Sequence, residues 1–173
     1  MPDTSGMLTF PVGTGRFNFR TAGVWIDDGY VLLQGDPSAA FWVLPGGRAE
    51  HMEPAEDALR RELREELAFG EEMRIGPLLW VMQNFFSASE GGDWHELGFY
   101  FAVTPPAADA ARLADKLREH PCAEPDSELS FRWFRIADLP AICPIRPTFL
   151  NSALLNLPAT PQIIMHHGRE REG

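Results

Sequence analysis

Residues 46–69 read GGRAEHMEPAEDALRRELREELAF and hold the strongest helix pattern of the chain. Pro54 suits the first helical position, because an N–H at that position would have no partner inside the helix. Acidic residues follow in the next turn, where the helix dipole favours negative charge. Leucines recur every four residues from Leu59 to Leu67, which makes one apolar stripe. We therefore expect a helix over residues 53–69 that packs through this stripe.

Three carboxylates lie beside the stripe on the same helix. Glu62, Glu65 and Glu66 occupy positions i, i+3 and i+4, which at roughly 100° per residue span an arc of about 100°. Crowded carboxylates repel one another, and a hard divalent cation relieves this repulsion. Oxygen ligands favour Mg²⁺ or Mn²⁺ over zinc. The spacing therefore predicts a divalent-metal site on one patch of the helix.

The spacing of these acidic residues resembles the Nudix box, which reads Gly, five residues, Glu, seven residues, Arg-Glu-aliphatic-any-Glu-Glu-any-Gly-aliphatic. The chain matches the pattern at Gly47, Glu53, Arg61, Glu62, Leu63, Glu65 and Glu66. It departs at Ala68, where the family has glycine, and at Phe69, where an aliphatic residue is usual. Glycine would relax a left-handed helix end, so the first departure concerns that end and not the carboxylates. The resemblance extends over roughly residues 17–157.

The resemblance implies an α/β fold, namely a Nudix-type α/β/α sandwich with a mixed sheet. It implies a pyrophosphohydrolase, in which water attacks phosphorus in the diphosphate bond of a nucleoside-diphosphate-linked substrate. Mg²⁺ or Mn²⁺ would neutralise phosphate oxygens and lower the pKa of bound water. Two substrate classes stay open, ADP-ribose-type sugar nucleotides and (deoxy)nucleoside triphosphates. The alternative function is a catalytically silent Nudix-fold domain that senses or regulates through a nucleotide.

The resemblance also assigns roles to single residues. The metal ligands would be the backbone carbonyl of Gly46 and the carboxylates of Glu62, Glu65 and Glu66. Glu53 would orient the catalytic water, and Arg61 would hold the glutamates through charge-assisted hydrogen bonds. The choice of the general base stays open among Glu66, Glu96, Glu124, Asp126 and Glu128. Of these, we carry Glu66 and Glu128 forward as catalytic candidates.

Substrate contacts outside the box are predicted at Arg20, Phe85, Glu96 and Arg146. Arg20 and Arg146 lie near the ends of predicted elements and could hold phosphate or ribose, although a structural arginine is the commoner case. Phe85 could stack on a nucleobase, but an aromatic residue at period two in a strand more often belongs to the core.

The rest of the chain predicts further strands and helices within one domain of residues 1–173. Strands are predicted at 17–27, 30–34, 41–44, 75–86, 94–104 and 130–136. Asp27-Asp28-Gly29 indicates a hairpin between the first two. Helices are predicted at 107–120, as a surface insertion with Leu113 and Leu117 facing inward, and at 148–157. Residues 158–173 are predicted to form a short strand, at 162–166, or a loose tail.

Charge and composition restrict the partners. A formal charge of −10 without a basic run argues against a nucleic-acid polymer. The N-terminus lacks a secretory pattern and no apolar run reaches membrane-spanning length, so we expect a cytoplasmic protein without a membrane partner. Cys122 and Cys143 show no zinc-ligand spacing and are expected to be reduced thiols. The expected partner is a small-molecule nucleotide. Because dimers are frequent in the family that the chain resembles, a homodimer is a further expectation.

Overall fold

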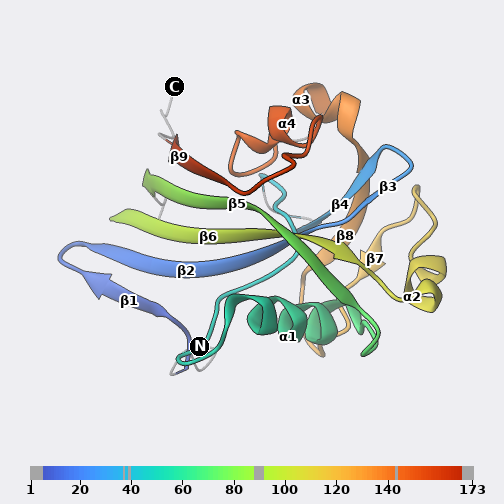
Figure 1. Cartoon of the computed structure of the whole chain (residues 1–173), viewed down its shortest axis with the longest axis horizontal. Coiled ribbons are helices and arrows are strands. Elements are labelled where there is room, and N and C mark those ends of the chain that lie inside the picture. The colour runs from blue at the N-terminus through green and yellow to red at the C-terminus, as the bar shows by residue number, and fades with distance from the viewer. Residues whose placement is uncertain (1–5, 37, 39, 88–91, 143, 169–173) are drawn as a thin grey trace.

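The computed structural model describes residues 6–36, 38, 40–87, 92–142 and 144–168, and these form two β-sheets with helices on either side (Figure 1). The larger sheet has the strand order β1 (Thr9–Val12), β2 (Gly15–Val24), β6 (Asp93–Thr104), β5 (Arg74–Ser87) and β9 (Gln162–Gly168). The smaller sheet has the order β3 (Ile26–Asp27), β4 (Tyr30–Gly35), β8 (Ser130–Arg135) and β7 (His120–Pro121). In the larger sheet β2 runs parallel to β6 and β5 runs parallel to β9, while the other neighbours are antiparallel. The mixed sheet is therefore confirmed.

Helices pack on both faces of the strands. The helix α1 (Ala55–Leu67) lies on one side in Figure 1, and α3 (Leu139–Ile142) and α4 (Leu150–Ala153) lie on the other. The predicted leucine stripe of α1 is buried in a core cluster with Trp25, which links β2 to β3, and with aromatic residues of the strands, namely Phe101, Phe131 and Trp133. A second core cluster joins α3 and α4 to the opposite face through Leu139, Leu150, Val31, Leu33 and Trp80. Full burial of one such leucine contributes roughly 2 kcal/mol, so these two clusters hold the layers together. The α/β/α sandwich is confirmed.

The start of the sheet differs from the sequence prediction. The predicted strand 17–27 is two strands, because the chain leaves the larger sheet at Trp25 and enters the smaller one as β3. The predicted hairpin is confirmed, with Asp28 and Gly29 at φ 48° and 77° in the turn. The strand β1, which pairs antiparallel with β2, was not predicted from the sequence.

The box helix begins and ends inside its predicted range. It runs over Ala55–Leu67 rather than 53–69, and Pro54 is its extended N-cap. Ala68 follows in the left-handed region at φ 52° and ψ 37°, and its N–H donates to the Leu63 carbonyl. Ala68 therefore adopts the conformation for which the usual glycine of the box is suited, at the steric cost of its Cβ.

Replacing Ala68 with glycine is expected to stabilise the protein. The substitution removes a left-handed strain of about 1–2 kcal/mol, and the greater freedom of glycine in the unfolded chain offsets about 0.4–1 kcal/mol of this gain. The melting temperature should rise by about 1–4 °C. As a matched control, Ala111→Gly in the helix α2 (Ala107–Arg112), where no left-handed residue is present, should lower it. A lower melting temperature for Ala68→Gly would show that the helix end is not strained.

The predicted helix over 107–120 is wrong beyond its first half. The helix α2 ends at Arg112, and the chain then turns and pairs as β7 with β8. Leu113 is buried, as predicted, but Leu117 is 96% exposed and does not face inward. A tertiary contact explains the early end, because the Trp133 side chain donates to the Leu113 carbonyl at 2.7 Å.

Two shorter predictions also need correction, and a third, left open, is decided in part. The helix predicted at 148–157 is limited to α4, four residues long. The strand predicted at 41–44 makes only isolated bridges, in which Trp42 pairs with Ile145 and Val43 with Gln34. The open choice at 158–173 is settled for its first part, because Gln162–Gly168 is an edge strand of the larger sheet; residues 169–173 lie outside the described residues. No helix in the described chain is long and apolar enough to cross a bilayer.

Candidate active site

Two glycines bring the loop before α1 against the acidic helix. A Cβ on Gly46 would lie 2.2 Å from the Thr21 carbonyl oxygen, and Gly46 has φ 141°. A Cβ on Gly47 would lie 2.2 Å from the carboxyl carbon of Glu62. Because real Cβ atoms do not approach this closely, the backbone of β2 requires glycine at Gly46, and a side chain at Gly47 would displace the Glu62 carboxylate.

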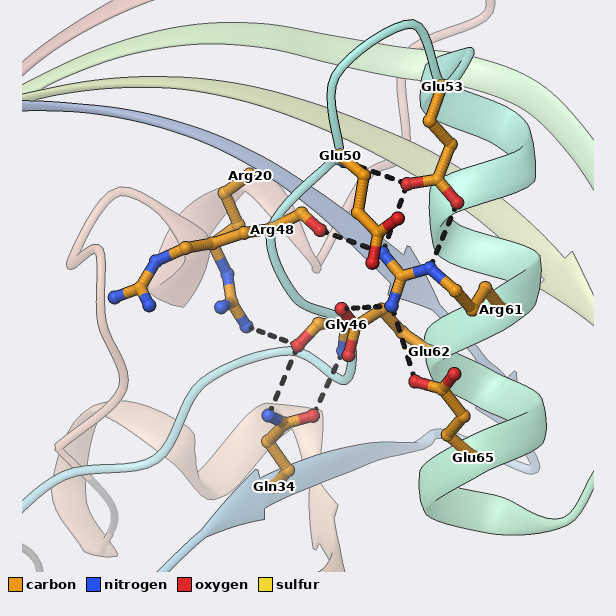
Figure 2. A network of polar contacts seen from close by, with 9 residues as sticks. All are labelled: Arg20, Gln34, Gly46, Arg48, Glu50, Glu53, Arg61, Glu62 and Glu65. Carbon is orange, nitrogen blue, oxygen red and sulfur yellow. Dashed lines mark hydrogen bonds and ion pairs between the residues drawn. The ribbon is translucent and has the colours of Figure 1, made fainter. Parts of the chain in front are cut away.

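Arg61 is the centre of the hydrogen-bond network in the box (Figure 2). It binds both oxygens of Glu53, at 2.9 and 3.0 Å, in a bidentate pair. It also donates to Glu62 Oε1 at 2.9 Å and to Glu65 Oε2 at 3.2 Å. A last bond to the Arg48 carbonyl, at 2.9 Å, fixes the preceding loop. Arg61 therefore holds three of the box carboxylates and the loop in one arrangement.

The charges in this network shift the pKa values of its members. The hydrogen bonds to Glu53 are the main reason that the pKa of Arg61 rises, and burial opposes this only in part. Burial would raise the pKa of Glu53, but the hydrogen bonds from Arg61 and from the Glu50 N–H outweigh it and lower that pKa. For Glu62, burial is the largest cause and raises the pKa despite the contact with Arg61. Glu53 is thus held as an anion whose oxygens are already engaged.

Glu66 differs from the other box carboxylates. It is 5% exposed, and its Oε2 atom has no hydrogen-bond partner within the described residues. Burial first, and then the nearby charge of Glu62, raise its pKa to about 8. A buried carboxylate oxygen without a partner is costly. A bound cation would remove this cost.

The donors at this place fit a hard divalent cation. Arg61 uses one oxygen of Glu62 and one of Glu65, which leaves the second oxygen of each for an ion. The Gly46 carbonyl accepts hydrogen bonds from Arg20 at 3.1 Å and from Gln34 at 3.3 Å, which occupy both of its lone pairs, so one of these bonds has to open before this oxygen can bind an ion. No three acidic, histidine or cysteine side chains of the described residues already surround a common ion position. These oxygen donors could hold Mg²⁺ or Mn²⁺ once the side chains adjust.

Two adjoining cavities lie beside the box. The cavity of about 420 Å³ is lined by Glu62, Glu66, Gly46 and Gly47 among others, and we call it the acidic cavity. The cavity of about 300 Å³ is lined by both aromatic and polar residues, and we call it the side cavity. Arg20, Phe86 and Glu96 line both. A ligand with a charged part and a flat part could therefore occupy the two together.

The structure brings most of the predicted substrate contacts to the side cavity. Arg20, Glu96 and Arg146 all line it. Phe85 does not, because it lies on the other face of β5, where its ring contacts those of His95 and His167. Side chains alternate along a strand, so the neighbouring residue, Phe86, points to the cavities instead.

Sequence reasoning missed Asn84 and His166, which also line the side cavity. Asn84 precedes two phenylalanines in β5. His166 lies in the segment for which the sequence left a short strand or a loose tail open. Only strand alternation around the cavity could have indicated Asn84, and nothing in the sequence pairs it with His166.

The loop carboxylates are not equivalent. All three, Glu124, Asp126 and Glu128, are exposed. Glu124 is near enough to raise the pKa of Glu66, and the adjacent Ala123 N–H donates to the Glu66 carbonyl at 2.7 Å. No hydrogen bond or ion pair joins Glu128 to the box in the described chain.

The chain belongs to the Nudix family. A model of the NUDIX domain matches residues 18–152, which contain α1 and both glycines. With its acidic box positions intact, the chain is a pyrophosphohydrolase of this family. A search of curated proteins finds no significant match.

Solved structures support the fold. A mutator MutT protein from Bacillus halodurans is similar at 16% identity and a TM-score of 0.58, over 88% of this chain and 91% of that one. A Nudix hydrolase from Nitrosomonas europaea gives 16% identity and a TM-score of 0.56, over 87% and 79%. An ADP-ribose pyrophosphatase from Streptococcus suis gives 11% identity and a TM-score of 0.50, over 86% and 98%. The TM-scores establish a shared architecture, and identities this low leave the substrate open.

Proposed function

We propose that this protein hydrolyses the diphosphate bond of a nucleoside-diphosphate-linked substrate with the help of Mg²⁺ or Mn²⁺. The observation that carries the proposal is the buried Glu66 carboxylate on the wall of the acidic cavity, one oxygen of which has no hydrogen-bond partner among the residues that the structure describes. A domain that has lost catalysis usually lacks some of the box carboxylates, whereas this chain keeps all of them.

The proposed metal ligands are the Gly46 carbonyl and the carboxylates of Glu62, Glu65 and Glu66. Such an ion would supply charge neutralisation at the phosphate oxygens and a more acidic water. Arg61 would keep Glu62 and Glu65 in place, since it holds one oxygen of each. Glu53 would support the arrangement through Arg61 and the Glu50 N–H rather than accept a proton, because both of its oxygens are engaged.

Glu124 is the proposed general base. It is exposed and its charge acts on Glu66, so it lies near enough to the box to be assigned the proton of the attacking water. Arg20 would meet phosphate oxygens from the wall that the two cavities share. The side cavity would take the nucleoside part, with the Phe86 ring as one wall.

A substrate panel tests the function. Purified protein is assayed with ADP-ribose, nucleoside triphosphates, NADH and dinucleoside polyphosphates, each with Mg²⁺, with Mn²⁺ and with a chelator. We expect turnover of at least one diphosphate substrate only with metal present. Calorimetry distinguishes the silent alternative, since nucleotide binding without heat of reaction and without metal dependence would refute hydrolysis.

Two further proposals concern the state of the protein. The edge strand β9 exposes Ile163 by 78% and Met165 by 68%, and no charged residue stands between Gln162 and Gly168. An unprotected apolar edge favours pairing with a second copy, so we propose a homodimer; light scattering that finds only monomer at micromolar concentration would refute it.

A nucleotide substrate and the free Cys122 thiol support a cytoplasmic location.

A further inference from the structure

Four neighbouring strands carry polar side chains in a single row next to the side cavity. The register sets Asn18 opposite Glu96, Glu96 opposite Asn84, and Asn84 opposite His166. Asn18 Nδ2 donates to Glu96 Oε2 at 2.7 Å, and His166 Nδ1 lies 2.8 Å from Asn84 Oδ1. We call these four residues the polar row. Its last three members line the side cavity.

The neighbours of Asn84 fix the orientation of its amide. Glu96, directly opposite on β6, carries a carboxylate that only accepts hydrogen bonds. The Asn84 NH₂ group is therefore best turned towards Glu96 and the cavity, with its Oδ1 towards His166. Asn84 is only 8% exposed, so a wrong orientation would leave a buried donor and a buried acceptor unpaired.

This orientation determines the proton on His166. Because Asn84 Oδ1 is an acceptor, His166 Nδ1 must carry the hydrogen. His166 Nε2 then accepts from the Thr148 hydroxyl at 2.9 Å. Burial, followed by the charges of Arg146 and His167, lowers the pKa of His166, which favours this neutral form.

We propose that His166 is a positioning residue for substrate selection: it holds the Asn84 amide so that its NH₂ group meets a hydrogen-bond acceptor on the substrate base. The inference rests on the proposed function, in that the side cavity takes the nucleoside part. The strand β9 lies outside the segment that matches the NUDIX domain. The selecting contact is therefore supplied by a strand outside the matched segment.

The first test needs no substrate. In ¹⁵N-labelled protein at neutral pH, long-range ¹H–¹⁵N spectra of the imidazole distinguish the two tautomers. We expect His166 to be protonated at Nδ1 and unprotonated at Nε2. A proton on Nε2 would overturn the proposal whatever the enzyme turns over, whereas failure of the substrate panel would refute only the proposed function.

The second test compares His166→Asn with His166→Gln. The amide nitrogen of asparagine stands where Nδ1 stands, while that of glutamine stands nearer to Nε2. Selection of the base is measured as a ratio of two kcat/KM values. The two substrates are ADP-ribose and its inosine counterpart, or ATP and ITP if triphosphates are the substrates. His166→Ala should bring this ratio about three- to tenfold closer to one, with kcat changed by no more than about twofold.

His166→Asn should keep the ratio of the wild type and His166→Gln should lose it. Gln162→Ala, an exposed change on the same strand, is the control and should leave the ratio unchanged. The proposal is overturned if glutamine rescues and asparagine does not, or if His166→Ala lowers kcat and leaves the ratio unchanged.

Discussion

Glu66→Gln is expected to reduce metal-dependent turnover at least about 10³-fold. A metal ion stabilises the transition state by several kcal/mol, and each 1.4 kcal/mol corresponds to a factor of ten in rate. Glutamine retains the size of Glu66 but loses the charge that would bind the ion. The measurement is kcat with Mg²⁺ on the substrate that the panel identifies, together with the metal affinity from calorimetry.

The same substitution should stabilise the metal-free protein. The pKa of Glu66 is raised in the fold from an ordinary value of 4.5 to about 8, so its protonated form favours folding. This stability is fully present below about pH 4.5 and is lost as the pH rises through about 8. Glutamine does not titrate, so Glu66→Gln does not lose this stability. In the presence of a chelator, the melting temperature of Glu66→Gln minus that of the wild type should therefore increase as the pH rises from about 4.5 to about 8.

Adding Mg²⁺ should reverse the order, because only the wild type gains stability from binding the ion. Glu56→Gln is the control, since Glu56 is exposed in the first turn of the same helix. If Glu66→Gln is less stable than the wild type without metal at pH 8, Glu66 is not the strained carboxylate described above.

Glu124→Gln is expected to lower kcat by about 10²–10⁴-fold, the usual contribution of a general base. Glu128→Gln should stay within about twofold of the wild type, because no hydrogen bond or ion pair within the described residues joins Glu128 to the box. Both residues are exposed acids of one loop, so each variant removes the same charge. A difference in kcat between the two variants therefore reflects the position of the residue and not its charge alone.

Equal losses in the two variants would mean that the loop acts through its overall charge. A loss in Glu128→Gln alone would return the role of the base to the residue that the sequence analysis carried forward. Melting temperatures of both variants, measured alongside, separate catalysis from folding.

The acidic helix was predictable because its information is local. The leucine stripe and the carboxylate spacing depend on helix geometry alone, and the burial of Leu59, Leu63 and Leu67 confirms the stripe. The long strands β5 and β6 were also predicted, since each is a long apolar segment next to turn residues. The helix over 107–120 failed because a tertiary contact, from Trp133 to the Leu113 carbonyl, outweighs local propensity.

The substrate side was not predictable in the same way. Which of Phe85 and Phe86 lies at the cavities depends on the phase of strand alternation, and a shift of one residue reverses it. Asn84 and His166 come together only through the parallel pairing of β5 with β9, 82 positions apart in the sequence. A pattern read along the chain does not contain that pairing.

The position of β9 at the sheet edge makes it exchangeable. Removing or replacing an edge strand breaks pairing on one side only, so β9 can be recoded or grafted while the box and its loop keep their own contacts. Chemistry and substrate choice are thus carried by separate parts of the polypeptide. Libraries confined to residues 162–168 would explore new specificities without touching the residues that cut the bond.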